Sequence, residues 1–144
     1  RRIGAGAIGA VEQVVITSRD PGPPPVAYIK VSGGLFRDMT IHDFDTARWM
    51  LGEEPVEAFA YGATLVDQAI GDAGDIDSAM VLLRTVSGRM AHINNSRRAA
   101  YGYDQRVEVF GSAGRLIAGN RVATTVELAN ADAVAADKPL HFFL

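Results

Sequence analysis

The sequence lacks cysteine altogether, and this absence excludes several kinds of chemistry. Without a thiol there is no disulfide, no cysteine nucleophile and no thiolate metal site. Hydrophobic residues make up 48% of the chain and charged residues 22%, so a sizeable packed core can supply the stability instead. Because cysteine-free chains suit a reducing compartment, we expect a cytoplasmic protein.

The sequence also lacks long apolar runs and a strong excess of one charge. A membrane-spanning helix needs roughly 20 apolar residues, and no stretch approaches that length. No signal peptide is recognisable, because no apolar segment follows the opening residues. A net charge of −3 provides no basic surface for nucleic acid or for anionic lipid. We therefore expect neither nucleic acid nor a membrane among the partners.

Metal-binding and nucleophile motifs are missing as well. The three histidines, His42, His92 and His141, show no paired ligand spacing. The acidic stretch 71–75 lacks the spacing and the closing glutamate of a calcium loop, which favours a solvated turn. There is no Gly-x-Ser-x-Gly nucleophile elbow. The sequence predicts no metal site.

One motif formally matches a dinucleotide-binding fingerprint, at Gly4-Ala5-Gly6-Ala7-Ile8-Gly9. That fingerprint works after a strand and at the start of a helix, whose N-terminal amides hold the pyrophosphate. Here only three residues precede the motif, and β-branched residues typical of a strand follow it. We therefore expect no cofactor-binding residue in this chain.

The fold class follows from hydrophobic periodicity and turn signals. Strands are predicted at 11–17, 56–66, 76–85, 89–97, 104–110, 115–118 and 121–128, with hairpins about 86–88 and 119–120. The proline-rich loop 21–25 leads into a short segment, 26–31, that we expect to be extended. One dominant helix lies near 35–51, and Gly52 ends it. This is an α+β pattern: an open-faced, mostly antiparallel sheet with a helix packed on one face, the other face being covered by a second subunit.

The dominant helix carries two faces with different chemistry. Phe44, Ala47 and Leu51 form its apolar stripe, and Asp38 is placed to cap its N-terminus. Asp38 and His42 stand one turn apart on another face, and Asp45 follows His42 by three residues. A histidine between carboxylates can accept a proton near neutral pH. The alternative is that Asp38 only caps the helix and His42 faces solvent.

A second concentration of polar residues lies at 92–104. Alternation places His92, Asn94 and Ser96 on one face of a strand, and Ile93, Asn95 and Arg97 on the other. Amides, hydroxyls and guanidinium groups beside tyrosine rings suit a polyhydroxylated ligand. An exposed strand end with its turn explains the same residues equally well.

Two motifs resemble one known family. The run 33–45 reads Gly-Gly-Leu-Phe-Arg-Asp-x-x-x-His-Asp-x-Asp, and it resembles the signature of the glucose–fructose oxidoreductase and inositol dehydrogenase (Gfo/Idh/MocA) family. The run 93–111 is similar to the myo-inositol dehydrogenase branch. The resemblance covers essentially the whole chain but only the C-terminal half of a family member. It implies an open-faced sheet domain that forms homo-oligomers, and an N-terminal Rossmann domain that carries NAD and a catalytic lysine.

The resemblance also implies roles for individual residues. His42 would take the hydroxyl proton while hydride leaves for NAD, and Asp38 would orient the substrate and the lysine. Tyr101 matches a position that lines the sugar pocket, and Asn95 and Arg98 are candidate substrate contacts beside it. Asp45, chosen for its spacing from His42 and not from the resemblance, is expected to support the imidazole without touching the substrate.

This chain departs from the family pattern because the Rossmann half and its lysine are absent. We expect residues 1–144 to be a single C-terminal domain for substrate binding and oligomerisation, cut at both ends and inactive alone. The expected parent protein is an NAD-dependent polyol dehydrogenase, most similar to myo-inositol 2-dehydrogenase. A non-catalytic assembly module and an independent sugar-binding protein are the alternatives.

Overall fold

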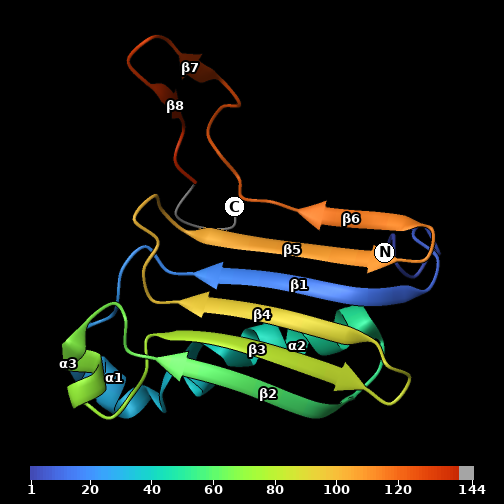
Figure 1. The fold of residues 1–144 in the computed structure, drawn as a ribbon, viewed down its shortest axis with the longest axis horizontal. Helices are drawn as coiled ribbons and strands as arrows, with labels where there is room; N and C mark the ends of the chain where they lie inside the picture. The colour runs from blue at the N-terminus through green and yellow to red at the C-terminus, as the bar shows by residue number, and fades with distance from the viewer. Residues whose placement is uncertain (140–144) are drawn as a thin grey trace.

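A computed structural model describes residues 1–139, and a six-stranded sheet dominates them (Figure 1). The sheet contains β1 (Val11–Arg19), β2 (Pro55–Ala63), β3 (Ser78–Thr85), β4 (Met90–Ser96), β5 (Asp104–Gly111) and β6 (Gly114–Ala118). A separate hairpin joins β7 (Glu127–Ala129) and β8 (Val134–Ala136). The helical elements are α1 (Val26–Ser32), the π-helical turn η1 (Phe36–Thr40), α2 (Ile41–Leu51) and α3 (Gln68–Asp72).

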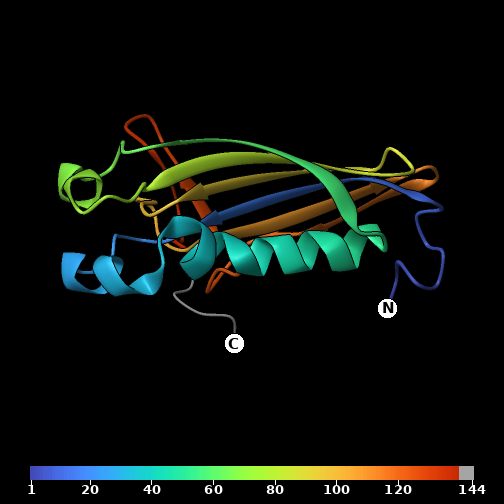
Figure 2. The same ribbon diagram turned by 90° about the horizontal axis from the view of Figure 1, so that it is seen from below.

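The strand order is β2-β3-β4-β1-β5-β6, and the pairing is antiparallel except between β1 and β4. The long connection from β1 carries α1, η1 and α2 before the chain returns to the sheet edge as β2. These helices lie together on one face, as Figure 2 shows. The predicted α+β class is confirmed, and residues 1–139 contain no Rossmann domain. None of their helices is long and apolar enough to cross a membrane.

The covered face of the sheet holds the main core. Alternate residues of the central strands point to α2, and those facing it are buried. Ala47 and Leu51 of α2 are fully buried against them, with Phe44 partly buried beside them. The predicted apolar stripe of the helix is thus confirmed. The core members are Ile8, Val11, Val14, Ile16, Ala47, Leu51, Val81, Leu83, Ala91, Ile93 and Val109.

The opposite face, which we call the bare face, has no helix over it (Figure 2). One row of neighbours crosses this face from edge to edge: Phe59, Leu82, His92, Val15, Glu108 and Ile117. The four apolar members of the row are all exposed. Phe59 also packs edge-on against Tyr61, with ring centroids 5.0 Å apart. Such a row is typical of a surface that contacts another protein.

Two local predictions are wrong, and a third is only partly right. The segment 26–31 is helix α1, whose first turn is closed by hydrogen bonds from the Tyr28 and Ile29 amides to the Pro25 carbonyl at 2.9 and 3.2 Å. The stretch 121–128 does not pair with β6. Instead β6 pairs with β5 across the turn at 111–114, and β7 pairs with β8. The stretch 71–75 does contain a turn with exposed Asp72 and Gly74, but it also ends helix α3, and its Asp75 accepts a hydrogen bond from the Leu35 amide.

The predicted cap at Asp38 is also wrong. Asp38 lies inside η1, which continues directly into α2, and no side chain caps either element. Gly33 and Gly34 both have positive φ, near 90°, so the chain turns sharply before η1. A Cβ on Gly34 would lie 2.9 Å from Oδ1 of Asp75, so this close approach requires glycine. The sharp entry leaves the Asp38 carboxylate free to bond elsewhere.

Candidate active site

A cavity of about 470 Å³ lies on the helix side, where the end of β1 meets α1, η1 and the start of α2. Its ionisable lining comprises Asp20, Tyr28, Asp38, His42, Asp43, Arg97 and Tyr103. Ser18 and Gln105 add further hydrogen-bonding groups. The volume lies within the roughly 300–1,000 Å³ usual for small-molecule sites. Three carboxylates, an imidazole and two phenols therefore converge on one small-molecule-sized space.

Asp38 stands between two partners in this cavity. Its Oδ1 accepts a hydrogen bond of 2.5 Å from the Tyr28 hydroxyl, and its Oδ2 lies 3.0 Å from an Arg97 guanidinium nitrogen. The hydrogen bond to the Asp38 carboxylate raises the pKa of Tyr28, because ionised Tyr28 would face a negative charge and lose the bond. Helix α1, η1 and the end of β4 thus meet at this one carboxylate.

Asp43 is the second carboxylate, and a short chain of buried amides and hydroxyls holds it. Asn95 donates from Nδ2 to Asp43 Oδ2 at 2.7 Å, while Asn95 Oδ1 accepts from Thr40 at 2.7 Å. Burial raises the pKa of Asp43, and the Asn95 hydrogen bond and the nearby His42 oppose this increase. Asn95 therefore lies behind Asp43 with both ends of its amide engaged. Its predicted contact with substrate stays a prediction.

Asp20, the residue that directly follows β1, is the third carboxylate. Burial raises the pKa of Asp20, and the Arg97 charge lowers it. Of the smaller effects, the Asp38 charge raises this pKa and a hydrogen bond with Tyr103 lowers it. The pKa of Tyr103 is raised in turn by its own burial and by the Asp20 charge. Buried carboxylates with raised pKa values are characteristic of functional sites.

His42 lies on the exposed side of the first turn of α2 and lines the same cavity as Asp38. The structure thus brings together the predicted pair, although a π-helical turn rather than a regular α-helix spaces them. Asp45 does not line the cavity. Its carboxylate faces solvent and lies 3.7 Å from Arg48 in an ion pair. Support of His42 by Asp45 stays a prediction.

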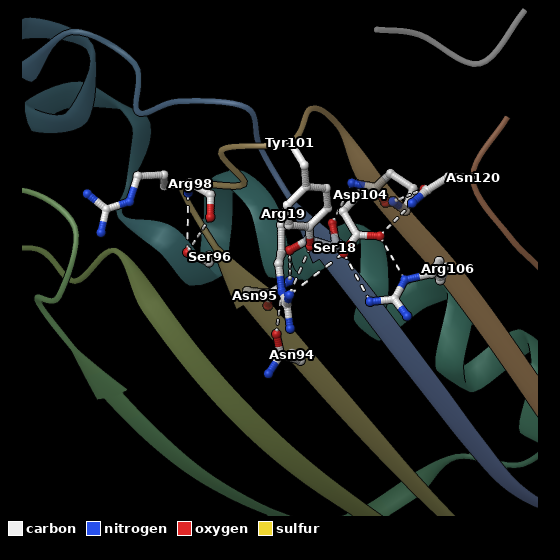
Figure 3. Close-up of polar contacts among 11 residues, drawn as sticks. Ser18, Arg19, Asn94, Asn95, Ser96, Arg98, Tyr101, Asp104, Arg106 and Asn120 are labelled. Carbon is white, nitrogen blue, oxygen red and sulfur yellow. Dashed lines mark hydrogen bonds and ion pairs between the residues drawn. The ribbon is translucent and has the colours of Figure 1, made fainter. Parts of the chain in front are cut away.

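Tyr101 and Arg98 lie on the other side of the sheet (Figure 3). The Tyr101 hydroxyl donates to Asp104 Oδ2 at 2.5 Å and accepts from Arg19 at 3.1 Å. Arg19 and Asp104 point to the bare face, since their neighbours Ser18 and Gln105 line the cavity on the helix side. Arg98 lines a second cavity of about 550 Å³ on the bare face, which Asn95 also borders although its side chain bonds to Thr40 and Asp43 on the helix side. Substrate binding by Tyr101 and Arg98 stays a prediction.

The glycine-rich stretch at 4–9 does not fit a nucleotide. It forms turns that lead directly into β1, so no helix N-terminus points at a pyrophosphate. Gly9 instead packs against the β5–β6 turn, where a Cβ would lie 2.3 Å from the Ser112 hydroxyl. Within residues 1–139, no group of three histidine or acidic side chains could hold a metal ion. His141 lies outside the described residues.

Several cavity residues were missed from sequence. Tyr28 was not predicted to line the cavity, because segment 26–31 was predicted to be extended and not helical. Asp20 and Tyr103 are loop residues with no periodic signal. Arg97 could have been found, because alternation already places it on the same strand face as Ile93 and Asn95.

The comparisons with known proteins agree on one family. The family model described as the GFO/IDH/MocA C-terminal domain matches residues 1–117. The chain is 59% identical to an inositol 2-dehydrogenase of Rhizobium meliloti, over 99% of this chain and 43% of that protein. It is 58% identical to a myo-inositol 2-dehydrogenase of Thermotoga maritima, over 96% of this chain and 42% of that protein. The chain thus spans less than half the length of these relatives.

Solved structures show the same fold. A putative myo-inositol dehydrogenase from Sinorhizobium meliloti superimposes with a TM-score of 0.92 at 60% identity, over 99% of this chain and 43% of that one. A scyllo-inositol dehydrogenase from Lactobacillus casei, solved with NAD(H) and scyllo-inositol bound, superimposes with a TM-score of 0.80 at 28% identity. That match covers 96% of this chain and 42% of the other.

Proposed function

This chain belongs to the GFO/IDH/MocA family through its C-terminal domain, and from that premise we propose that it is the substrate-binding half of an NAD-dependent polyol dehydrogenase. The observation that carries the proposal is the cavity in which Asp38 and His42 meet. The two inositol dehydrogenases at 58–59% identity support myo-inositol, or a polyol close to it, as the substrate.

The proposed reaction oxidises a ring carbon that bears a hydroxyl to a ketone. NAD, held by a nucleotide-binding domain outside this chain, would supply the hydride acceptor. The hydroxyl proton would pass to an imidazole nitrogen of His42, whose position in the cavity suits a general base. Asp38 would accept a hydrogen bond from the substrate and fix the reacting carbon relative to His42.

The rest of the cavity suits the remaining hydroxyls of a polyol. Asp20 and Asp43 present carboxylate oxygens, while Ser18 and Gln105 present groups that both donate and accept. A polyol is uncharged and needs several oriented hydrogen bonds rather than an ion pair. No cluster of lysine or arginine side chains faces the cavity to select an anionic substrate, since Arg97 is the one such residue in its described lining.

We further propose that residues 1–144 form one domain and that its bare face assembles the protein into a homo-oligomer. The exposed row that contains Phe59, Leu82 and Ile117 supports this role, because water-exposed apolar rows are costly in a monomer. A non-catalytic assembly or sugar-binding module is the second candidate function, and the same bare face favours it. In either case the isolated chain would show no turnover.

The test is to join this chain to a nucleotide-binding half of a close relative and to follow NADH formation with myo-inositol. We expect turnover by the joined protein and none by the chain alone. If the joined protein oxidised neither myo-inositol nor scyllo-inositol, the dehydrogenase proposal would be contradicted. If assembly persisted in that case, the second candidate would stand.

A further inference from the structure

Arg97 is one of the most buried charged groups in the chain, with only 1% of its side chain exposed. It follows directly after β4 and points to the helix side, in alternation with Ile93 and Asn95. Its backbone amide donates to the Asp77 carbonyl at 2.8 Å, which fixes where the side chain begins. A guanidinium in such a place is expensive to desolvate, and a buried ion pair by itself is weak evidence for stability.

The partners of Arg97 are carboxylates, but the contacts are not well-aligned hydrogen bonds. One guanidinium nitrogen lies 3.0 Å from Asp38 Oδ2 and 3.9 Å from Asp75 Oδ2. Among the described residues, Nε and this nitrogen of Arg97 have no partner that meets hydrogen-bond geometry, and neither does Oδ2 of Asp75. Arg97 therefore acts on Asp38 mainly through its charge and its position.

We propose that Arg97 is a positioning residue, whose buried guanidinium holds the Asp38 carboxylate towards the cavity in the orientation that the reaction requires. This inference rests on the proposed function and extends it. A direct contact with substrate is not available to the Arg97 nitrogens named above, because they are inaccessible to solvent. Through these two nitrogens Arg97 therefore acts on Asp38 and not on the substrate.

The charges around the cavity explain why a fixed cation is needed there. Asp20, Asp38 and Asp43 all line it, and each negative charge makes the next one harder to maintain. The Arg97 charge lowers the pKa of Asp20, in opposition to burial and to the Asp38 charge. The other titratable groups facing this cluster are Tyr28, Tyr103, His42 and Asp75. Loss of Arg97 would remove the charge that lowers the pKa of Asp20, so Asp20 would take up its proton at higher pH.

The experiment is a double-mutant cycle in the complete enzyme, with Arg97→Met, Asp38→Asn and both together. Arg97→Met should lower kcat by about 10²-fold with a much smaller change in KM, as expected for loss of a positioned catalytic group. In the Asp38→Asn background the same change should cost less than about threefold, because the residue through which Arg97 acts is already gone. Lys30→Met, which removes an exposed positive charge of α1 that does not line the cavity, is the control and should leave kcat unchanged.

A pH profile separates positioning from a merely structural role. The acid limb of kcat should move to higher pH in Arg97→Met and much less in Arg97→Lys, which retains the charge. If Arg97→Met does not fold, Arg97→Lys replaces it in the cycle with Asp38→Asn, and a smaller effect is expected. Fully additive losses, or an unmoved acid limb in a folded variant, would overturn the inference. Failure of the wild type to oxidise any polyol would instead contradict the proposed function.

Discussion

The hydroxyl of Tyr28 donates a hydrogen bond to Oδ1 of Asp38 across 2.5 Å and so joins helix α1 to η1. The bond occupies one oxygen of the carboxylate that we propose orients the substrate, while Arg97 lies beside the other oxygen. Substrate that bonds to Oδ1 of Asp38 would have to share it with Tyr28 or displace Tyr28.

The first prediction concerns the ionisation of Tyr28. Because ionised Tyr28 would lose its hydrogen bond and face the Asp38 charge, the pKa of Tyr28 is raised above the usual value of about 10. Ultraviolet titration of the wild type against Tyr28→Phe isolates this tyrosine. In Asp38→Asn, Tyr28 should titrate at lower pH than in the wild type. A Tyr28 that ionises at or below its usual pKa would contradict the geometry.

The second prediction concerns acid stability and Asp104. Burial alone would raise the pKa of Asp104, but hydrogen bonds from Arg106, Tyr101 and Asn120 lower it to about 2 (Figure 3). Since the unfolded chain has an aspartate pKa of about 3.9, the ionised group stabilises the fold above that pH. The contribution, on the order of 2 kcal/mol, is lost as the pH falls from about 4 to about 2.

Asp104→Asn tests this sign directly. Urea unfolding at pH 7 should show a lower free energy of unfolding for the variant than for the wild type. Between pH 4 and pH 2 the unfolding free energies of the two proteins should converge, because the wild type loses the stabilisation by ionised Asp104, which the variant lacks at every pH. A constant difference across that range would contradict the lowered pKa.

The sheet and its main helix were predictable because their signals are periodic. Alternation fixed both faces of β4, and helical spacing fixed the buried side of α2 at Ala47 and Leu51. The cavity was only half predictable. Asp38 and His42 lie in a recognisable motif, whereas Asp20 reaches the cavity only through tertiary packing at the end of β1.

The failures have physical causes of the same kind. Segment 26–31 is rich in residues that favour strands, yet it is helical with Ile29 buried, because tertiary packing can override local preference. The stretch after 118 carries β-branched residues but few buried contacts, so local preference did not determine its pairing. Gly34 lies against the carboxylate of Asp75, a tertiary contact that the local sequence pattern does not indicate.

The third prediction concerns Asn95, whose amide engages both Thr40 and Asp43. Asn95→Ala would leave two buried groups without this partner, which costs about 1–3 kcal/mol of unfolding free energy for an unsatisfied polar group. It would also raise the pKa of Asp43 further, since the Asn95 hydrogen bond lowers it. Chemical denaturation and KM distinguish the two roles. A raised KM at unchanged stability would favour direct substrate contact instead.

The fourth prediction concerns the bare face. Leu82 lies in the middle of the exposed row, and Leu82→Glu would place a charge where we propose that a second copy packs. Light scattering on the wild type should give an oligomer, and the variant should dissociate at concentrations at least about tenfold higher. Val86→Glu, at an exposed apolar residue in the β3–β4 turn, is the control and should not change the mass. A monomeric wild type would contradict the assembly role.

The central claim is that His42 receives the substrate proton, and one measurement tests it most directly. The steady-state rate of myo-inositol oxidation should be compared between His42→Ala and the wild type, each joined to a nucleotide-binding domain. We predict a loss of at least about 10²-fold in kcat, the usual contribution of a positioned base, with the fold unchanged by circular dichroism. Turnover by His42→Ala at the wild-type rate would contradict the account.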